Sequence, residues 1–168
     1  ALAVAHEAGV IHRDVKPENI FLARDATVGE PRVVLLDFGL ARPTSGGGLT
    51  TVGRFVGTPE YSSPEQVRGD RDLGPPCDLY AGGITLWGML AGKPPVREDS
   101  DIGTLQAQLS RHVPSPGKAL RSAPAHLRET ALLLLEKDPS RRPSNAGAAL
   151  EILKRPQGPA VLARKLSR

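Results

Sequence analysis

Cysteine and aromatic residues are both scarce in this chain of 168 residues. Cys77 is the only cysteine, so no disulfide can form within the chain, and a reducing compartment such as the cytoplasm is expected. The residue stands before an apolar run, which favours a buried and unreactive thiol. Aromatic residues make up only 4% of the chain, whereas 18 glycines and 16 prolines predict many turns.

Long hydrophobic runs are absent as well. The longest weakly polar stretch, residues 79–92, is shorter than the roughly 20 residues that a membrane-spanning helix needs. These residues are therefore not expected to cross a bilayer, and a membrane contact is expected only through regions outside them. A hydrophobic content of 39% and a charged content of 24% are typical of a compact globular domain.

The positive charge does not indicate nucleic-acid binding, because it is concentrated at one end. The chain has 22 basic and 18 acidic residues, a net charge of +4. Five of the basic residues lie from Lys154 onward, so the preceding part carries 17 basic and 18 acidic residues. We expect residues 156–168 to be a solvated basic tail or linker after a domain over residues 1–155. A juxtamembrane segment drawn to anionic lipid is the alternative.

Apolar patterning predicts a mostly α-helical fold with one small β-hairpin. Residues 78–91 are apolar nearly all round, as in a helix at the middle of a domain. Short apolar runs at residues 20–22 and 32–36 flank a turn, which is typical of a hairpin. Further helices are expected over residues 1–9, 101–111, 124–137 and 144–154.

Residue types near the helix ends and along the helix faces give finer expectations. Gly9 is expected to end the first helix, and Ser144 to cap the last. The leucine-rich helix over residues 124–137 is expected to be buried. The face of the helix over residues 101–111 that is expected to pack on the core consists of Ile102, Leu105 and Leu109.

Two polar segments beside the expected hairpin contain the residue types that phosphoryl transfer needs. Residues 12–19 read His-Arg-Asp-Val-Lys-Pro-Glu-Asn, and Asp-Phe-Gly follows at residues 37–39. The reaction uses an aspartate to orient the attacking hydroxyl and a lysine near the transferred phosphate. It also uses an asparagine and a second aspartate to hold Mg²⁺. The two segments in this order are far more specific than either alone.

Both segments resemble the catalytic and metal-binding loops of the eukaryotic-type (Hanks-type) serine/threonine protein kinases, of the sort common in bacteria. Residues 57–65 (Gly-Thr-Pro-Glu-Tyr-Ser-Ser-Pro-Glu) resemble that family's P+1 loop and the Ala-Pro-Glu motif, with Ser63 in place of the alanine. Residues 78–80 resemble the start of the central helix of the C-terminal lobe, and residues 137–143 a late turn of that lobe.

The elements of a kinase N-terminal lobe do not precede His12. The eleven residues upstream hold no Gly-x-Gly-x-x-Gly loop, no Val-Ala-Ile-Lys-type strand and no helix glutamate. The resemblance therefore implies a protein-kinase-like C-terminal lobe with the N-terminal lobe absent. We expect the 168 residues alone to be inactive, and the missing lobe to be a partner of this chain.

The resemblance implies a role for each polar residue of the two loops. Asp14 is expected to be the catalytic base, and Lys16 to neutralise charge on the moving phosphoryl group. Thr58 is expected to contact both residues and to mark specificity for hydroxyl amino acids. Asn19 and Asp37 are expected to bind Mg²⁺, or Mn²⁺ in its place, and with it ATP.

Neighbouring residues are expected to act through packing. The resemblance implies that His12 and Phe38 stack in a hydrophobic spine anchored on Asp78, with Gly39 completing the metal-loop motif. His12 is thus expected to be structural rather than a general base. Phe21 matches a position that packs beneath the adenine ring, although an ordinary core role fits the sequence equally well.

Regulation and the structural ion pair are implied in the same way. Arg13 could pair with a phosphate on Thr50 or Thr51 of the expected activation loop. These threonines fit equally well as small residues of a flexible loop. Glu65 and Arg142 are expected to form a buried ion pair.

Three functions are compatible with these features. The resemblance favours a serine/threonine protein kinase that phosphorylates protein substrates. A pseudokinase or truncated docking scaffold is the alternative, which the full set of catalytic residues disfavours. A small-molecule phosphotransferase is disfavoured by the motifs at residues 57–65 and 137–143.

Overall fold

The computed structural model describes residues 1–24, 29, 31–38, 57–110, 113, 120 and 123–154. The α-helices are α1 (Leu2–Glu7), α2 (Pro64–Arg68), α3 (Pro76–Ala91), α4 (Asp101–Ser110), α6 (Ala125–Leu134) and α7 (Ala146–Lys154). Single 3-10 turns are η1 (Pro17–Asn19), η2 (Pro59–Tyr61) and η3 (Pro139–Arg141), and the strands are β1 (Ile20–Arg24) and β2 (Pro31–Leu35).

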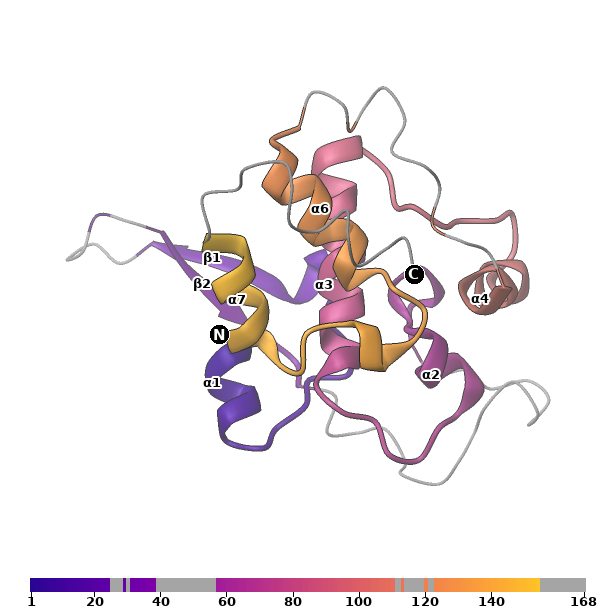
Figure 1. Cartoon of the computed structure of the whole chain (residues 1–168), viewed down its shortest axis with the longest axis horizontal. Coiled ribbons are helices and arrows are strands. Elements are labelled where there is room, and N and C mark those ends of the chain that lie inside the picture. The colour runs from indigo at the N-terminus through magenta and orange to yellow at the C-terminus, as the bar shows by residue number, and fades with distance from the viewer. Residues whose placement is uncertain are drawn as a thin grey trace.

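Helix α3 runs through the middle of the molecule, with the other helices around it (Figure 1). Its side chains form the centre of the core, in which the side chains buried to 5% exposure or less are Tyr80, Ile84, Trp87, Leu120 and Leu135. The prediction of a buried central helix is therefore confirmed. Only its C-terminal end departs from it, because Met89 is 79% exposed.

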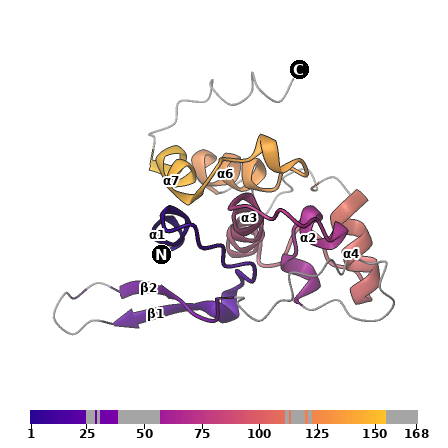
Figure 2. The ribbon, with the colours of Figure 1, turned by 90° about the horizontal axis from the view of Figure 1, so that it is seen from below.

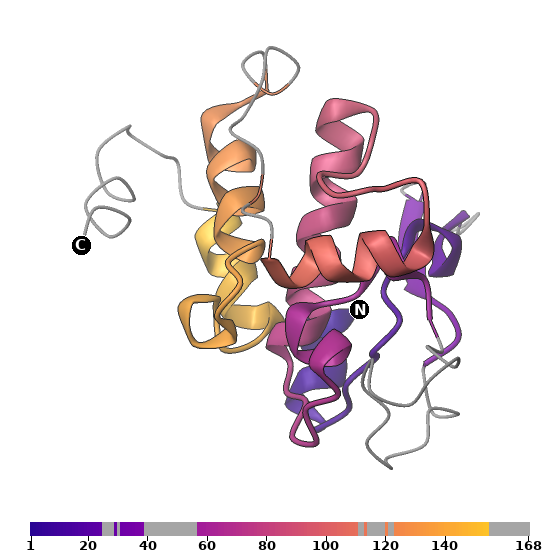
Figure 3. The same ribbon diagram turned by 90° about the vertical axis from the view of Figure 1, so that its right-hand side faces the viewer.

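The hairpin lies on one side of α3, and helices α6 and α7 lie on the opposite side (Figure 2). Strands β1 and β2 pair antiparallel, from Ile20 opposite Leu35 to Arg24 opposite Pro31. Figure 3 shows α6 running alongside α3 while α4 crosses in front of α3. The mostly helical fold with one two-stranded sheet agrees with the prediction. No helix in the described ranges has the length and apolar character needed to span a bilayer.

Three of the finer expectations are wrong. On α4, Leu105 is buried as expected, but Ile102 is 62% exposed, and the buried face also contains Thr104 and Gln108, whose side chains bond to polar partners. Asn145 rather than Ser144 caps α7, since the N–H of Ala148 donates to Asn145 Oδ1 at 2.9 Å. Helix α6 ends at Leu134, three residues earlier than expected. Gly9, by contrast, follows α1 with φ of 72°, as its predicted role in ending that helix requires.

Gly83 determines how closely α3 and α6 approach each other. A Cβ atom at this position would lie 2.8 Å from Leu134 Cβ and 3.2 Å from Leu135 Cγ. Such contacts are too short for any side chain, so the helix pair can pack this closely only around glycine.

We expect Gly83→Ala to destabilise the fold by about 1–3 kcal/mol, because the added methyl group must push the two helices apart. Gly82→Ala is the matched control, since a Cβ there would have nothing within 4 Å. Urea unfolding measures both. Equal stability of the two variants would contradict this account of the helix contact.

Candidate active site

Hydrogen bonds to one buried carboxylate hold the loop over residues 12–19 against the start of α3. Asp78, which is 1% exposed, accepts the backbone N–H of His12 at 2.8 Å on one oxygen and that of Arg13 at 2.7 Å on the other. Arg13 has a φ of 65°, an unusual conformation for a residue other than glycine. The two bonds to Asp78 hold the loop in this conformation, immediately before Asp14.

A second histidine, which the sequence did not single out, completes this anchor. His6 Nε2 lies 2.9 Å from Asp78 Oδ2, and the N–H of Ala146 donates to His6 Nδ1 at 3.1 Å. Since Nδ1 accepts, Nε2 carries the ring proton and donates it to Asp78. His6 thereby joins α1, α3 and the start of α7 through one side chain.

The polar residues of the loop gather around Asp14. Lys16 Nζ lies 3.0 Å from Asp14 Oδ2 and donates to Thr58 Oγ1 at 3.1 Å. Asn19 Nδ2 donates to the backbone oxygen of Asp14 at 2.8 Å and to its Oδ2 at 3.2 Å. The side chains of Asp14 and Lys16 are 24% and 20% exposed, so they remain accessible to a substrate.

Asp37 is placed by the residues on either side of it. The His12 and Phe38 rings stack with centroids 4.5 Å apart, and His12 Nε2 lies 2.8 Å from the Leu36 oxygen. The N–H of Leu36 in turn donates to the backbone oxygen of Asn19 at 2.9 Å. The expected stacking of His12 and Phe38 is thus present, and Asp37, an exposed residue with a φ of 53°, stands next to the loop.

Asn19 and Asp37 are chemically suited to Mg²⁺. The Asn19 amide directs its nitrogen at Asp14, which leaves its oxygen as the atom that can ligate a cation. No group of three or more histidine, cysteine or acidic side chains suited to a metal occurs among the described residues. A site with two protein oxygen ligands, in which phosphates and water supply the rest, does not need such a group.

The serine that replaces the motif alanine has a local structural role. Ser63 is the N-cap of α2, and its Oγ accepts the N–H of Gln66 while Gln66 Oε1 accepts the N–H of Ser63. The other end of the Gln66 amide donates to the backbone oxygen of Arg13 at 2.8 Å. This capping pair therefore also supports the loop over residues 12–19, a contact that the sequence did not predict.

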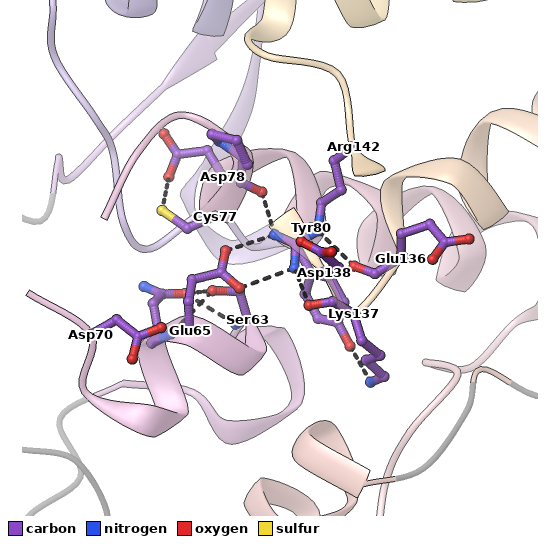
Figure 4. A network of polar contacts seen from close by, with 12 residues as sticks. Ser63, Glu65, Asp70, Cys77, Asp78, Tyr80, Glu136, Lys137, Asp138 and Arg142 are labelled. Carbon is purple, nitrogen blue, oxygen red and sulfur yellow. Dashed lines mark hydrogen bonds and ion pairs between the residues drawn. The ribbon is translucent and has the colours of Figure 1, made fainter. Parts of the chain in front are cut away.

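The predicted ion pair between Glu65 and Arg142 is confirmed. Arg142 Nη1 and Nη2 donate to the two carboxylate oxygens of Glu65 at 2.6 and 3.0 Å, and both residues are 5% exposed. The remaining N–H groups of Arg142 donate to the backbone oxygens of Glu136, Lys137 and Pro76. All five guanidinium donors therefore have acceptors, as a buried arginine requires (Figure 4).

A polar chain runs from this ion pair towards Thr58. Lys137 Nζ donates to Tyr80 Oη at 2.6 Å, and Tyr80 Oη donates to Gln108 Oε1 at 2.7 Å. Gln108 Nε2 then donates to the backbone oxygen of Glu60, in η2, at 2.7 Å. Burial, together with the Arg142 charge, lowers the pKa of Lys137 to about 8, and burial raises that of Tyr80.

Other expectations have mixed outcomes. Phe21 is 59% exposed, so it has no ordinary core role in this structure, and its contact with adenine stays a prediction. Cys77 is buried as expected, and burial, assisted by the neighbouring Asp78, raises the pKa of its thiol. Gly39, Thr50 and Thr51 lie outside the described residues, so their roles also stay predictions.

Known proteins are similar to this chain over most of its length. A family model described as protein kinase domain matches residues 1–156. "Serine/threonine-protein kinase pkn3" of Myxococcus xanthus is 42% identical over 88% of this chain and 28% of its own length. "Serine/threonine-protein kinase PknL" of Mycobacterium tuberculosis is 36% identical over 90% of this chain and 37% of its length. "Serine/threonine-protein kinase PkaA" of Streptomyces coelicolor is 39% identical over 86% of this chain and 25% of its own length. The chain spans little more than a third of these relatives at most.

We expect Arg142→Ala to destabilise the fold by about 3–5 kcal/mol, because it leaves the Glu65 carboxylate buried without its partner. The double variant Arg142→Met with Glu65→Met should recover much of that loss, since it removes both charges. Urea unfolding measures the three proteins. A single variant as stable as the double variant would contradict the pairing.

Lys137 makes a pH dependence testable. Folding lowers the pKa of Lys137 from 10.5 to about 8, so between these pH values the unfolded chain binds more protons than the folded chain. The free energy of unfolding therefore increases as pH rises above 8. We expect the stability of the parent protein relative to Lys137→Met to increase between pH 8 and 10. The comparison removes the contribution of the Cys77 thiol, which is the same in both proteins. The raised pKa of that thiol would by itself make stability fall as pH rises. A constant difference would contradict the low pKa.

Proposed function

The chain belongs to the protein kinase domain family, and we propose that it is the C-terminal lobe of an enzyme that transfers the γ-phosphate of ATP to serine or threonine hydroxyls of proteins. The observation that carries this proposal is the cluster in which Lys16 contacts both Asp14 and Thr58. The named relatives are serine/threonine protein kinases, which supports the same reaction.

Asp14 is the residue that accepts the proton of the substrate hydroxyl in this proposal. The hydroxyl oxygen forms a bond to the γ-phosphorus while the bond from that phosphorus to the bridging oxygen of ADP breaks. Lys16, already within 3.0 Å of the Asp14 carboxylate, offsets negative charge on the phosphoryl group. Thr58 keeps the Lys16 ammonium in position through its hydroxyl.

Asn19 and Asp37 are the residues that would hold Mg²⁺. The ion would neutralise charge on the phosphates of ATP. Asn19 also ties Asp14 to the metal site, since its amide nitrogen contacts both the backbone and the side chain of Asp14. One short loop thus connects the base to a metal ligand.

We also propose that an N-terminal lobe outside these residues covers the hairpin and completes the ATP site. The hairpin exposes large apolar side chains on both of its faces: Leu22 and Val33, which pair across the strands, are 64% and 50% exposed on one face, and Phe21 is 59% exposed on the other. Apolar side chains grouped in this way are typical of a contact surface. The isolated chain is accordingly proposed to be inactive, and a non-catalytic docking role is the alternative that the following experiment tests.

We expect Asp14→Asn in the full-length protein to lower kcat by about 10²–10⁴-fold, because the hydroxyl loses its base. The melting temperature should change little, since the asparagine has the same shape and keeps an oxygen that can accept the bond from Asn19. Transfer of radioactive phosphate from ATP to protein substrates measures the rate. Asp70→Asn is the control, because Asp70 is exposed and pairs with Arg68 at the surface.

A parent protein that folds but transfers no phosphate would favour the docking role. Normal turnover by Asp14→Asn would contradict the proposed mechanism itself.

A further inference from the structure

A cavity of about 280 Å³ opens beside the candidate active site. It lies between the C-terminal half of α3, the segment just after that helix, and the two segments that carry the site. Its walls include Pro17, Tyr61, Ile84, Gly88, Met89 and Lys93. Binding sites for drug-sized molecules have volumes of roughly 300–1,000 Å³, so this cavity is suited to something smaller, such as one side chain.

Two walls of the cavity continue directly from the catalytic cluster. Pro17 follows Lys16, and Tyr61 is at the end of the turn that begins after Thr58. The Lys16 and Thr58 side chains are themselves joined by a hydrogen bond of 3.1 Å. A peptide whose hydroxyl reaches Asp14 is therefore expected to run close to this cavity. Since an extended chain advances about 3.3 Å per residue, a residue near the phosphoacceptor can reach it.

The cavity wall is mainly apolar. Ile84, 1% exposed, closes it towards the core, and the Tyr61 ring and Pro17 line its sides. The polar atom of Thr85 is occupied elsewhere, because its Oγ1 donates to the backbone oxygen of Ala81 at 3.0 Å. Met89, which is 79% exposed, supplies a flexible wall that can adapt to different aliphatic shapes.

Charges near the cavity are mixed and do not favour a charged occupant. Glu18 and Glu60 lie near Tyr61: burial foremost, and then these two carboxylates, raise the pKa of the Tyr61 hydroxyl, while Arg97 lowers it. Arg97 Nε lies 3.7 Å from Glu60 Oε1, and Lys93 adds a second positive charge. With two positive charges against two negative ones, the apolar wall decides the selectivity.

Gly88 leaves the cavity open. A Cβ atom at this position would meet nothing within 4 Å, in contrast to Gly83 on the same helix, where it would clash with α6. Any larger side chain at position 88 would therefore project from α3 into space that borders the cavity.

We propose that this cavity binds one aliphatic side chain of the protein substrate, a few residues from the phosphoacceptor. The inference rests on the proposed kinase function and specifies the class of sequence that the enzyme selects. The side chain exchanges water for contact with Ile84, Pro17 and Tyr61, which favours leucine or isoleucine over alanine and over charged residues.

The test uses the full-length protein and synthetic serine peptides, each with leucine, alanine, glutamate or arginine placed at one position near the acceptor. We expect one position at which leucine gives a kcat/KM about 10-fold or more above alanine. Gly88→Leu should bring this ratio close to one, because the new side chain fills the cavity, and Gly88→Ala should lower it partly. Gly82→Ala is the matched control: it lies on α3 with an equally open Cβ position but does not line the cavity, so it should keep the ratio.

Both Gly88 variants replace a helical glycine with a better helix former, so the melting temperature should be kept or raised. A leucine preference that survives in the folded Gly88 variants would overturn the inference, as would a preference for arginine or glutamate in place of leucine. In these cases phosphate transfer still occurs and the proposed function stands. Absence of transfer to every peptide and protein substrate would instead refute the proposed function together with the inference.

Discussion

The buried carboxylate of Asp78 is the interaction on which the arrangement of the site depends. A carboxylate with 1% exposure is stable only if its oxygens accept hydrogen bonds, and it takes them from the backbone of His12 and Arg13 and from the His6 ring. The same bonds fix the backbone at Arg13 in its left-handed conformation. The hydrogen bonds that satisfy the buried Asp78 side chain are therefore the ones that hold the loop over residues 12–19 in place, and neither arrangement is favourable without the other.

A second set of polar contacts begins two residues further along α3 and supports the opposite side of the site. Arg142 pairs with Glu65 and lies over the Tyr80 ring, with the guanidinium carbon 4.7 Å from the ring centroid. The Tyr80 hydroxyl donates to Gln108, and Gln108 donates to the backbone of Glu60, two residues after Thr58. The first turns of α3 thus orient both the loop with Asp14 and the turn that follows Thr58, so they set the position of one relative to the other.

The sequence predicted those parts of the structure that depend on residue type at fixed spacing. The central helix, the hairpin and the Glu65–Arg142 pair were all predicted, because each has a local apolar pattern or a motif. The sequence did not predict the roles of His6, Gln66 and Gln108. Each bonds to at least one backbone atom far away in sequence, and a pattern of side-chain types does not show where backbone atoms lie. The expected face of α4 was right at Leu105 and wrong at Ile102, for a related reason. Apolar spacing gave no weight to a buried glutamine, which is stable there because its partners satisfy it.

The two ends of α3 have different physical characters, and this separates two functions along one helix. Its first turns carry the buried side chains of Asp78 and Tyr80, and truncating either one leaves its buried hydrogen-bond partners unpaired. Its last turns carry Gly88 and the exposed Met89, where added or altered side chains meet open space. If the cavity selects the substrate as proposed, changes at the second end can alter which proteins are phosphorylated while the geometry around Asp14 is kept. Selectivity can then vary through the last turns of α3 at little risk to the proposed chemistry, because the contacts that hold the loop over residues 12–19 are made by the first turns of the helix.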